Sequence, residues 1–418
     1  MFVQFFHTDF YNVVTSIGAP ETGPLPNAPE RSRKLDIPFD DVEYAPLEGD
    51  TELRKAVARY YNHLYRANKE SQYTEENICI VPGGRAGLTR VMSILGHVQA
   101  GYFCPDSTSY EQALSLFMRI NPAQYAHLDV NDALMSPEEF ELQTTGRGVG
   151  AVVLSNPCNP TGQSLEGENL DKYVQIARDT NTVLIIDEFY SHYYYDGEGT
   201  DPADGGADDD SNWPKTVSSS MFIEDVNKDP ILITNGLTKN WRCPGFCVGW
   251  IVAPERIVRM ISSAGSFLDG GANGPLQKLA LPMMELDFIR RDAWALQRHF
   301  KAKRDFLLQE LCRMGIKVQW KPTSTFYIWA DLSALPPPIN DCLVFFEECV
   351  RAKVICVPGV FFDVNPGKLR NIKRSKCISN VRFSYGPPMR HLILGMIKID
   401  GIIKKWSDTD LSRGSCRF

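Results

Sequence analysis

The 418-residue chain lacks the cysteine spacings of a disulfide-rich or zinc-binding protein. Its 11 cysteines stand singly, with no Cys-x-x-Cys pair, and an odd number cannot form a closed set of disulfides. Reduced thiols are typical of a reducing compartment. The cysteine pattern therefore predicts a cytoplasmic protein.

A long apolar run, a leader segment and an excess of basic charge are also absent. No run reaches the roughly 18 apolar residues that span a bilayer. Met1–His7 has no basic stretch before an apolar one, so it does not predict a signal peptide. A formal net charge of −7 argues against nucleic acid as a partner. We therefore expect no membrane and no nucleic-acid partner, which leaves small-molecule chemistry.

What the sequence does contain is an alternation of short apolar runs and helical patterns. Such runs, buried on both faces and separated by helices, are typical of a mostly parallel α/β sheet. A long helical pattern over 286–314 then leads to a second region that reads as α+β. Strands are expected at 78–82, 151–155, 182–187, 231–235 and 247–253, and in the second region at 316–320, 325–330, 354–357 and 379–384.

These patterns predict three parts. Residues 1–45 form an N-terminal arm with part of a small domain, 46–285 a large domain, and 286–418 a small C-terminal domain. The large domain carries an acidic insertion at about 196–220, with the run Asp208-Asp209-Asp210. This run lacks the alternating ligands of a calcium loop. We expect a solvated surface insertion instead.

Three polar segments follow predicted strands, where α/β sheets place ligand-facing groups. Asp187 closes one strand, and Lys239 lies just beyond another. The loop 156–162, Asn-Pro-Cys-Asn-Pro-Thr-Gly, follows a third. Taken singly, a helix cap, a surface lysine and an ordinary turn would explain them. Their combination is more specific.

Together these segments resemble fold-type I pyridoxal-phosphate (PLP) enzymes of the class I/II aminotransferase family, from about Ile17 to Gly386. The resemblance implies a PLP-dependent transferase fold: a mostly parallel seven-stranded sheet flanked by helices, plus a smaller α+β C-terminal domain. By this resemblance Lys239 forms a Schiff base with PLP and moves the substrate proton. Asp187 pairs with the protonated ring nitrogen, while Asn159 and Tyr190 hydrogen-bond the ring oxygen. Such chemistry needs a lowered lysine pKa and a fixed carboxylate.

Weaker matches concern the cofactor. Gly84, Arg85 and Ala86 open a helix whose N–H groups suit a phosphate. Tyr110 stands where the family usually places an aromatic that stacks on the ring, although a core tyrosine is an alternative. Tyr44 matches a tyrosine that reaches the phosphate of a neighbouring subunit, which implies a homodimer.

Other matches concern the substrate. Arg382, in Val381-Arg382-Phe383-Ser384, matches the arginine that binds the substrate α-carboxylate, a bidentate role suited to a guanidinium. Gly18 resembles part of the N-terminal segment that covers the substrate, and Asn159 is a further candidate for substrate binding.

Two positions depart from the family pattern. Cys247 replaces an arginine that grips the phosphate, and Gly236 replaces a serine. Arg242 and Arg85 are candidates to restore the positive charge, and Thr238 to add a hydroxyl.

The predicted function is an aminotransferase that moves an amino group between an amino acid and a 2-oxo acid. A PLP-dependent lyase, cyclase or oxidase in specialised biosynthesis is the alternative, and a non-catalytic subunit of the same fold is a third. The substrate side chain is not encoded in a motif. The lack of a second assignable arginine disfavours a dicarboxylic substrate.

Overall fold

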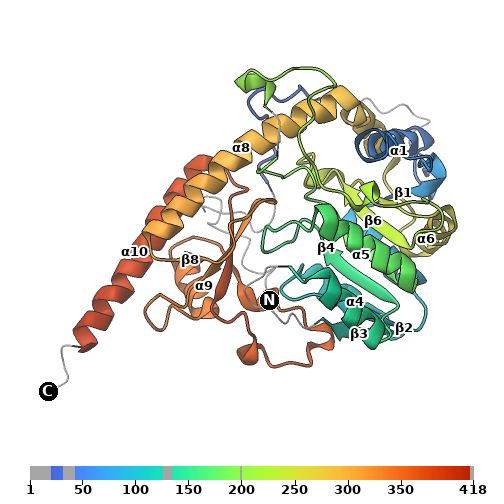
Figure 1. Ribbon diagram of the computed structural model, residues 1–418. Coiled ribbons are helices and arrows are strands. Elements are labelled where there is room, and N and C mark those ends of the chain that lie inside the picture. Colours follow the sequence, from blue (N-terminus) through green and yellow to red (C-terminus); the bar gives the residue numbers. More distant parts are fainter. Residues whose placement is uncertain (1–19, 32–42, 126–133, 198–199, 415–418) are drawn as a thin grey trace.

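The computed structural model describes residues 20–31, 43–125, 134–197 and 200–414. Within these residues, a seven-stranded sheet and a four-stranded sheet are joined by one long helix, α8 (Leu286–Arg313) (Figure 1). This mixed α/β architecture confirms the predicted fold class. None of the helices in the described ranges is both long and apolar enough to cross a membrane.

The large sheet has the strand order β1-β7-β6-β5-β4-β2-β3. Neighbours from β6 to β3 pair in parallel, whereas β7 runs antiparallel to both β1 and β6. The carboxyl ends of β4, β5 and β6 therefore meet at one edge, with Ser155 opposite Asp187 and Asp187 opposite Thr234. The strands are β1 (Ile78–Val81), β2 (Val98–Tyr102), β3 (Ile120–Gln124), β4 (Ala151–Ser155), β5 (Val183–Asp187), β6 (Ile231–Gly236) and β7 (Gly249–Val252).

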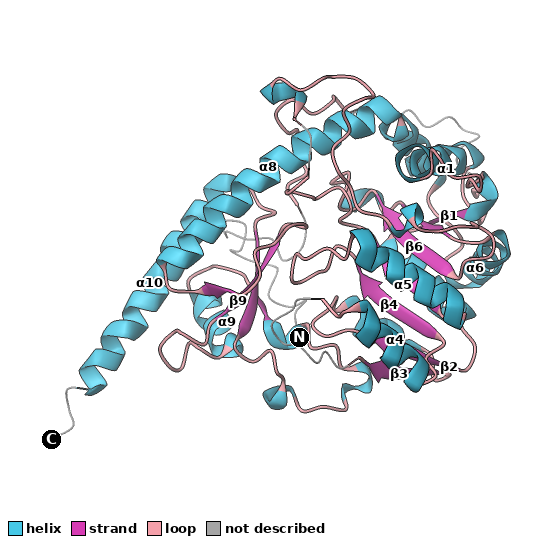
Figure 2. Cartoon of the chain, viewed as in Figure 1, coloured by secondary structure: helices cyan, strands magenta, loops and turns pink. Residues whose placement is uncertain are grey.

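Helices cover both faces of this sheet because its strands are apolar on both sides. In β1, Ile78 and Ile80 pack into a core with α1, α4 and α5, whereas Cys79 and Val81 pack into a second core with α2, α3 and α6. Figure 2 shows α4 and α5 lying across one face. The helices are α1 (Thr51–Tyr65), α2 (Gly84–Ile94), α3 (Ser109–Leu116), α4 (Pro137–Gly146), α5 (Gly167–Thr180), α6 (Glu255–Leu268) and α7 (Gly274–Ala280).

The smaller sheet is antiparallel, in the order β10-β11-β9-β8. Its core includes residues of α8 and of two further helices, and α10 runs beside α8 (Figure 1). The elements are β8 (Lys317–Val318), β9 (Tyr327–Asp331), α9 (Cys342–Arg351), β10 (Val357–Pro358), β11 (Asn380–Ser384) and α10 (Met389–Gly414). The division of the chain at residue 286 stays a prediction, although α8 begins at that point.

The acidic insertion is held at the surface by the first half of α8 (Figure 1). Asp208 forms an ion pair with Arg290 at 2.7 Å. The Trp294 indole donates to the Asn212 carbonyl at 3.2 Å. The segment is thus anchored to α8 as well as facing solvent.

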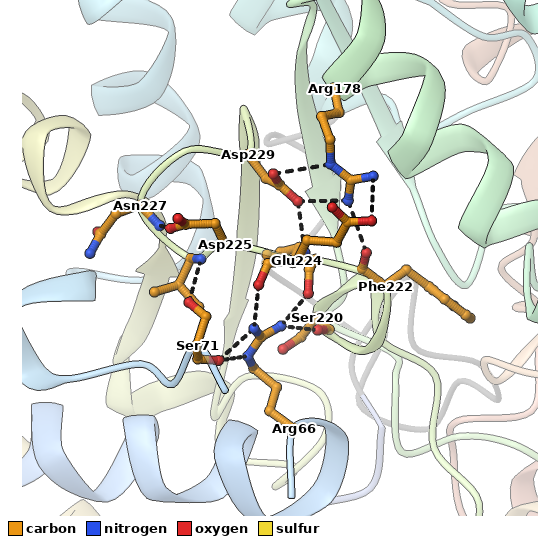
Figure 3. A network of polar contacts seen from close by, with 11 residues as sticks. Arg66, Ser71, Arg178, Ser220, Phe222, Glu224, Asp225, Asn227 and Asp229 are labelled. Atoms are coloured by element: carbon orange, nitrogen blue, oxygen red, sulfur yellow. Dashed lines mark hydrogen bonds and ion pairs between the residues drawn. The ribbon is translucent and has the colours of Figure 1, made fainter. Parts of the chain in front are cut away.

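Two arginines fix the loop that leads into β6 (Figure 3). Arg66, fully buried at the end of α1, donates to the carbonyls of Ser71, Ser220 and Ile223 at 2.6–2.9 Å. Arg178 of α5 binds the Asp229 carboxylate at 2.8 and 3.1 Å. Strand β6 begins at Ile231, directly after this loop. These contacts therefore fix the start of β6 and, with it, the position of its carboxyl end at the edge of the sheet.

Candidate active site

A cavity of about 610 Å³ opens at the carboxyl edge of β4, β5 and β6, between the two sheets. Three cationic side chains and one carboxylate line it among the described residues. The structure brings most of the predicted site residues together here: Gly84, Arg85, Asn159, Asp187, Tyr190, Thr238, Lys239 and Arg382.

Asp187 ends β5 and faces this cavity. Its carboxylate accepts hydrogen bonds from the Tyr110 hydroxyl at 3.2 Å and the Phe189 N–H at 3.3 Å. Burial raises the pKa of Asp187 from 3.8 to about 6, although these two hydrogen bonds and Lys239 oppose that rise. A cationic group beside it would favour the ionised form.

Lys239 follows β6 on a tightly held turn. The buried Asn240 side chain accepts from the His192 N–H at 3.0 Å and donates to the Ser191 hydroxyl at 2.9 Å. The Tyr193 hydroxyl donates to the Lys239 carbonyl at 3.0 Å. Burial, with help from nearby arginines, lowers the pKa of the Lys239 amine, which favours the nucleophilic neutral form.

Arg382 of β11 lies across the cavity, only 6% exposed. Its Nη1 donates to the Asn159 Oδ1 at 2.6 Å. Its guanidinium lies 3.9 Å from the ring centroid of Tyr327 and 4.7 Å from that of Phe362. The two aromatic rings hold the guanidinium by cation–π contacts, so it is oriented before any anion arrives.

Other predicted residues lie elsewhere. Tyr110 is fully buried behind Asp187 and is not among the lining residues, so it stands in the core rather than over the cavity. Ala86 does not line the cavity either. The Arg242 Nη1 donates to the carbonyls of Gly23 and Glu21 at 2.6 and 3.2 Å, outside the cavity. Tyr44 is 96% exposed. Gly18 lies outside the described residues.

The structure adds three residues that sequence reasoning did not assign to the site. Tyr327 lines the cavity, and its hydroxyl lies 3.1 Å from that of Tyr190. Phe362 lines the cavity beside Arg382, and Asn240 fixes the lysine turn. No local motif marks Tyr327 or Phe362. For Asn240, the only signal in the sequence is its position next to Lys239.

The donor set suits PLP. An amine of lowered pKa, a buried carboxylate and an arginine for a carboxylate share one cavity. Gly83 and Gly84 have no side chains, so a ligand in the cavity can approach the backbone at the start of α2. A Cβ on Gly84 would lie 2.7 Å from the Phe189 ring. A helix N-terminus of this kind favours a phosphate.

Comparison with known proteins agrees. Residues 14–372 match the family Aminotransferase class I and II. An aspartate aminotransferase of Pyrococcus horikoshii is 24% identical over 388 residues, covering 92% of this chain and 88% of that protein. A probable aspartate/prephenate aminotransferase of Aquifex aeolicus is 27% identical, covering 79% of this chain and 78% of its own length.

Solved structures show the same fold. A double mutant of Thermus thermophilus aspartate aminotransferase superposes with a TM-score of 0.71 at 22% identity, over 87% of this chain and 84% of that one. An aromatic aminotransferase from Pyrococcus horikoshii gives a TM-score of 0.70 at 20% identity, over 87% and 88%. The chain belongs to the class I and II aminotransferases. It is therefore a PLP-dependent transferase that acts on amino and oxo acids.

Proposed function

We propose that this enzyme transfers an amino group from an amino acid to a 2-oxo acid, with Lys239 as the covalent attachment point for PLP. The observation that carries the proposal is the pairing of Arg382 with Asn159 at 2.6 Å in the cavity that also holds Lys239 and Asp187. PLP supplies an electron sink that lets the substrate Cα lose a proton.

The protein side chains have separate roles. Arg382 binds the α-carboxylate and orients the Cα–H bond toward Lys239. The Lys239 amine, whose pKa is lowered, would take the proton from the substrate Cα and move it to the carbon on the other side of the amino nitrogen. Asp187 would hold the protonated ring nitrogen of PLP, because a cation beside this buried carboxyl favours its ionised form. Asn159 and Tyr190 would hold the ring oxygen.

The substrate side chain is proposed to be apolar rather than a second carboxylate. Val357, Phe362 and Tyr327 line the cavity near Arg382. Of the described lining residues, Arg85 is the one other arginine, and it lies at the α2 end. The relatives bear names for aspartate, prephenate and aromatic substrates, so their names leave both classes open.

The test is product analysis. Purified enzyme with PLP is incubated with amino acids of each side-chain class and an oxo acid, and the new amino acid is quantified by mass spectrometry. Equal amounts of new amino acid and new oxo acid support transamination. Ammonia, peroxide or a cyclic product without a new amino acid would instead support the lyase, oxidase or cyclase alternative. A dicarboxylic preference would refute the apolar pocket.

A homodimer in the cytoplasm completes the proposal. Tyr44 has an almost fully exposed ring, and it stands at the position that the family pattern assigns to the neighbouring site. Substitution Tyr44→Phe is expected to weaken PLP binding, and light scattering gives the assembly state. A monomer with full PLP affinity would refute this assignment.

A further inference from the structure

One end of the active-site cavity is formed by Gly83, Gly84, Arg85, Thr238 and Cys247, and we call it the phosphate end. By the family resemblance, Gly236 and Cys247 stand where a serine and an arginine usually serve the phosphate. A group that compensates for both losses must be found among the side chains that face this end.

Gly236 has no room for a side chain. A Cβ there would lie 2.5 Å from the Gly249 Cα and 3.1 Å from the Phe189 ring. The same ring covers Gly84, where a Cβ would lie 2.7 Å from it. The space that a serine would need is thus taken by backbone and by Phe189, so both glycines are required for this ring to pack.

The charge lost at Cys247 is not restored by Arg242. That guanidinium is directed at the carbonyls of Glu21 and Gly23, and its Nη2 lies 3.7 Å from Asp292. It therefore serves to hold the N-terminal segment. It does not line the active-site cavity.

The surroundings of Arg85 differ from those of Arg242. It lies in the first turn of α2, lines the cavity, and makes no ion pair with any residue of the described ranges. Its charge reaches the site, because it is one of the groups that lower the pKa of Lys239. Gly83, at φ +85°, places the free N–H groups of the same turn beside it.

We infer that Arg85, with the Thr238 hydroxyl and the α2 N-terminus, binds the cofactor phosphate in place of the family arginine. The charge now comes from the helix start rather than from the loop after Lys239. Because the Arg85 side chain is exposed, salt screens it more than it would screen a buried arginine. PLP binding is therefore expected to weaken as ionic strength rises.

The first experiment compares PLP with pyridoxal, which has no phosphate, by fluorescence titration of cofactor-depleted enzyme. Substitution Arg85→Ala is expected to weaken PLP binding about 10- to 100-fold and to leave pyridoxal binding unchanged. Arg256→Ala, an exposed arginine of α6, is the matched control. In the Arg85→Ala background, Cys247→Arg should restore much of the PLP affinity. Equal PLP affinity in wild type and Arg85→Ala would overturn the inference.

The second experiment uses the exposed Cys247 thiol as a reporter. Maleimide labelling, mapped by peptide mass, should be slowed by inorganic phosphate in wild type but not in Arg85→Ala. Cys312, exposed on α8, should label equally throughout. Unchanged protection in the variant would overturn the inference. Wild-type enzyme that binds neither PLP nor pyridoxal would refute the proposed function instead, so the two failures are distinguishable.

Discussion

Substituting Asp187→Asn should stabilise the cofactor-free protein while abolishing its activity. Burial raises the pKa of this carboxyl from 3.8 to about 6. Between these values the folded protein holds a proton that the unfolded chain has lost. Stability therefore falls as pH rises from about 4 to about 6 and stays low above that range. Asparagine removes this penalty.

The magnitude follows from the pKa shift. A rise of about two units corresponds to about 3 kcal/mol, since each unit is worth about 1.4 kcal/mol. This is an upper limit because water in the open cavity screens the charge. We expect the pH-dependent gain to be about 1–3 kcal/mol near pH 8 and about half of that near pH 5.

The assay is urea denaturation of cofactor-free wild type and Asp187→Asn at both pH values. Asp106 and Glu188, whose pKa values burial raises to about 7, titrate in a similar range. Both proteins contain these two groups, and the Asp187 charge is only the smallest cause of each shift, so most of their contribution cancels in the difference. PLP should then stabilise wild type more than the variant, because the ionised carboxylate has gained a cationic partner. A gain that is independent of pH would refute the reasoning.

Three other predictions concern the site and its support. Arg382→Ala should lower kcat/KM by an amount equivalent to about 2–5 kcal/mol, with Arg382→Lys in between and PLP affinity unchanged, as measured by steady-state kinetics and titration. Arg66→Ala should lower the free energy of unfolding by roughly 3–5 kcal/mol in urea, because several buried carbonyls lose their donor. Asn240→Ala should cost about 2 kcal/mol in the same assay and lower kcat more than PLP affinity, because the Lys239 turn loses its anchor.

The residues at the carboxyl edge of the large sheet were predictable because the sequence signals that mark them are local. A strand followed at once by a polar side chain places that side chain at the carboxyl edge, and parallel pairing brings such edges together. Asp187, Asn159 and Lys239 met in one cavity for this reason.

Side-chain direction was not predictable in the same way. Arg242 is close to Lys239 in sequence, yet its backbone has φ +55° and its side chain leaves the site. Tyr110 depends on how α3 packs against β5. Tyr327 and Phe362 enter the site from the smaller sheet and from the loop after β10, and no local pattern reports that contact. Helix α10 was not identified, because its many isoleucines and its glycines have low helix propensity.

The charges of the cavity connect its stability to its ligands. Arg85, Lys239 and Arg382 face one carboxylate, Asp187, so the described lining carries an excess of positive charge. Such an excess in a partly buried place destabilises the empty protein. A cofactor phosphate at the Arg85 end and a substrate carboxylate at the Arg382 end would offset it at separate points. Arg85 lies in α2 and Arg382 in β11, and both arginines lower the pKa of Lys239. Binding of each anionic group should therefore stabilise the fold, and the two gains should be coupled through Lys239 rather than strictly additive.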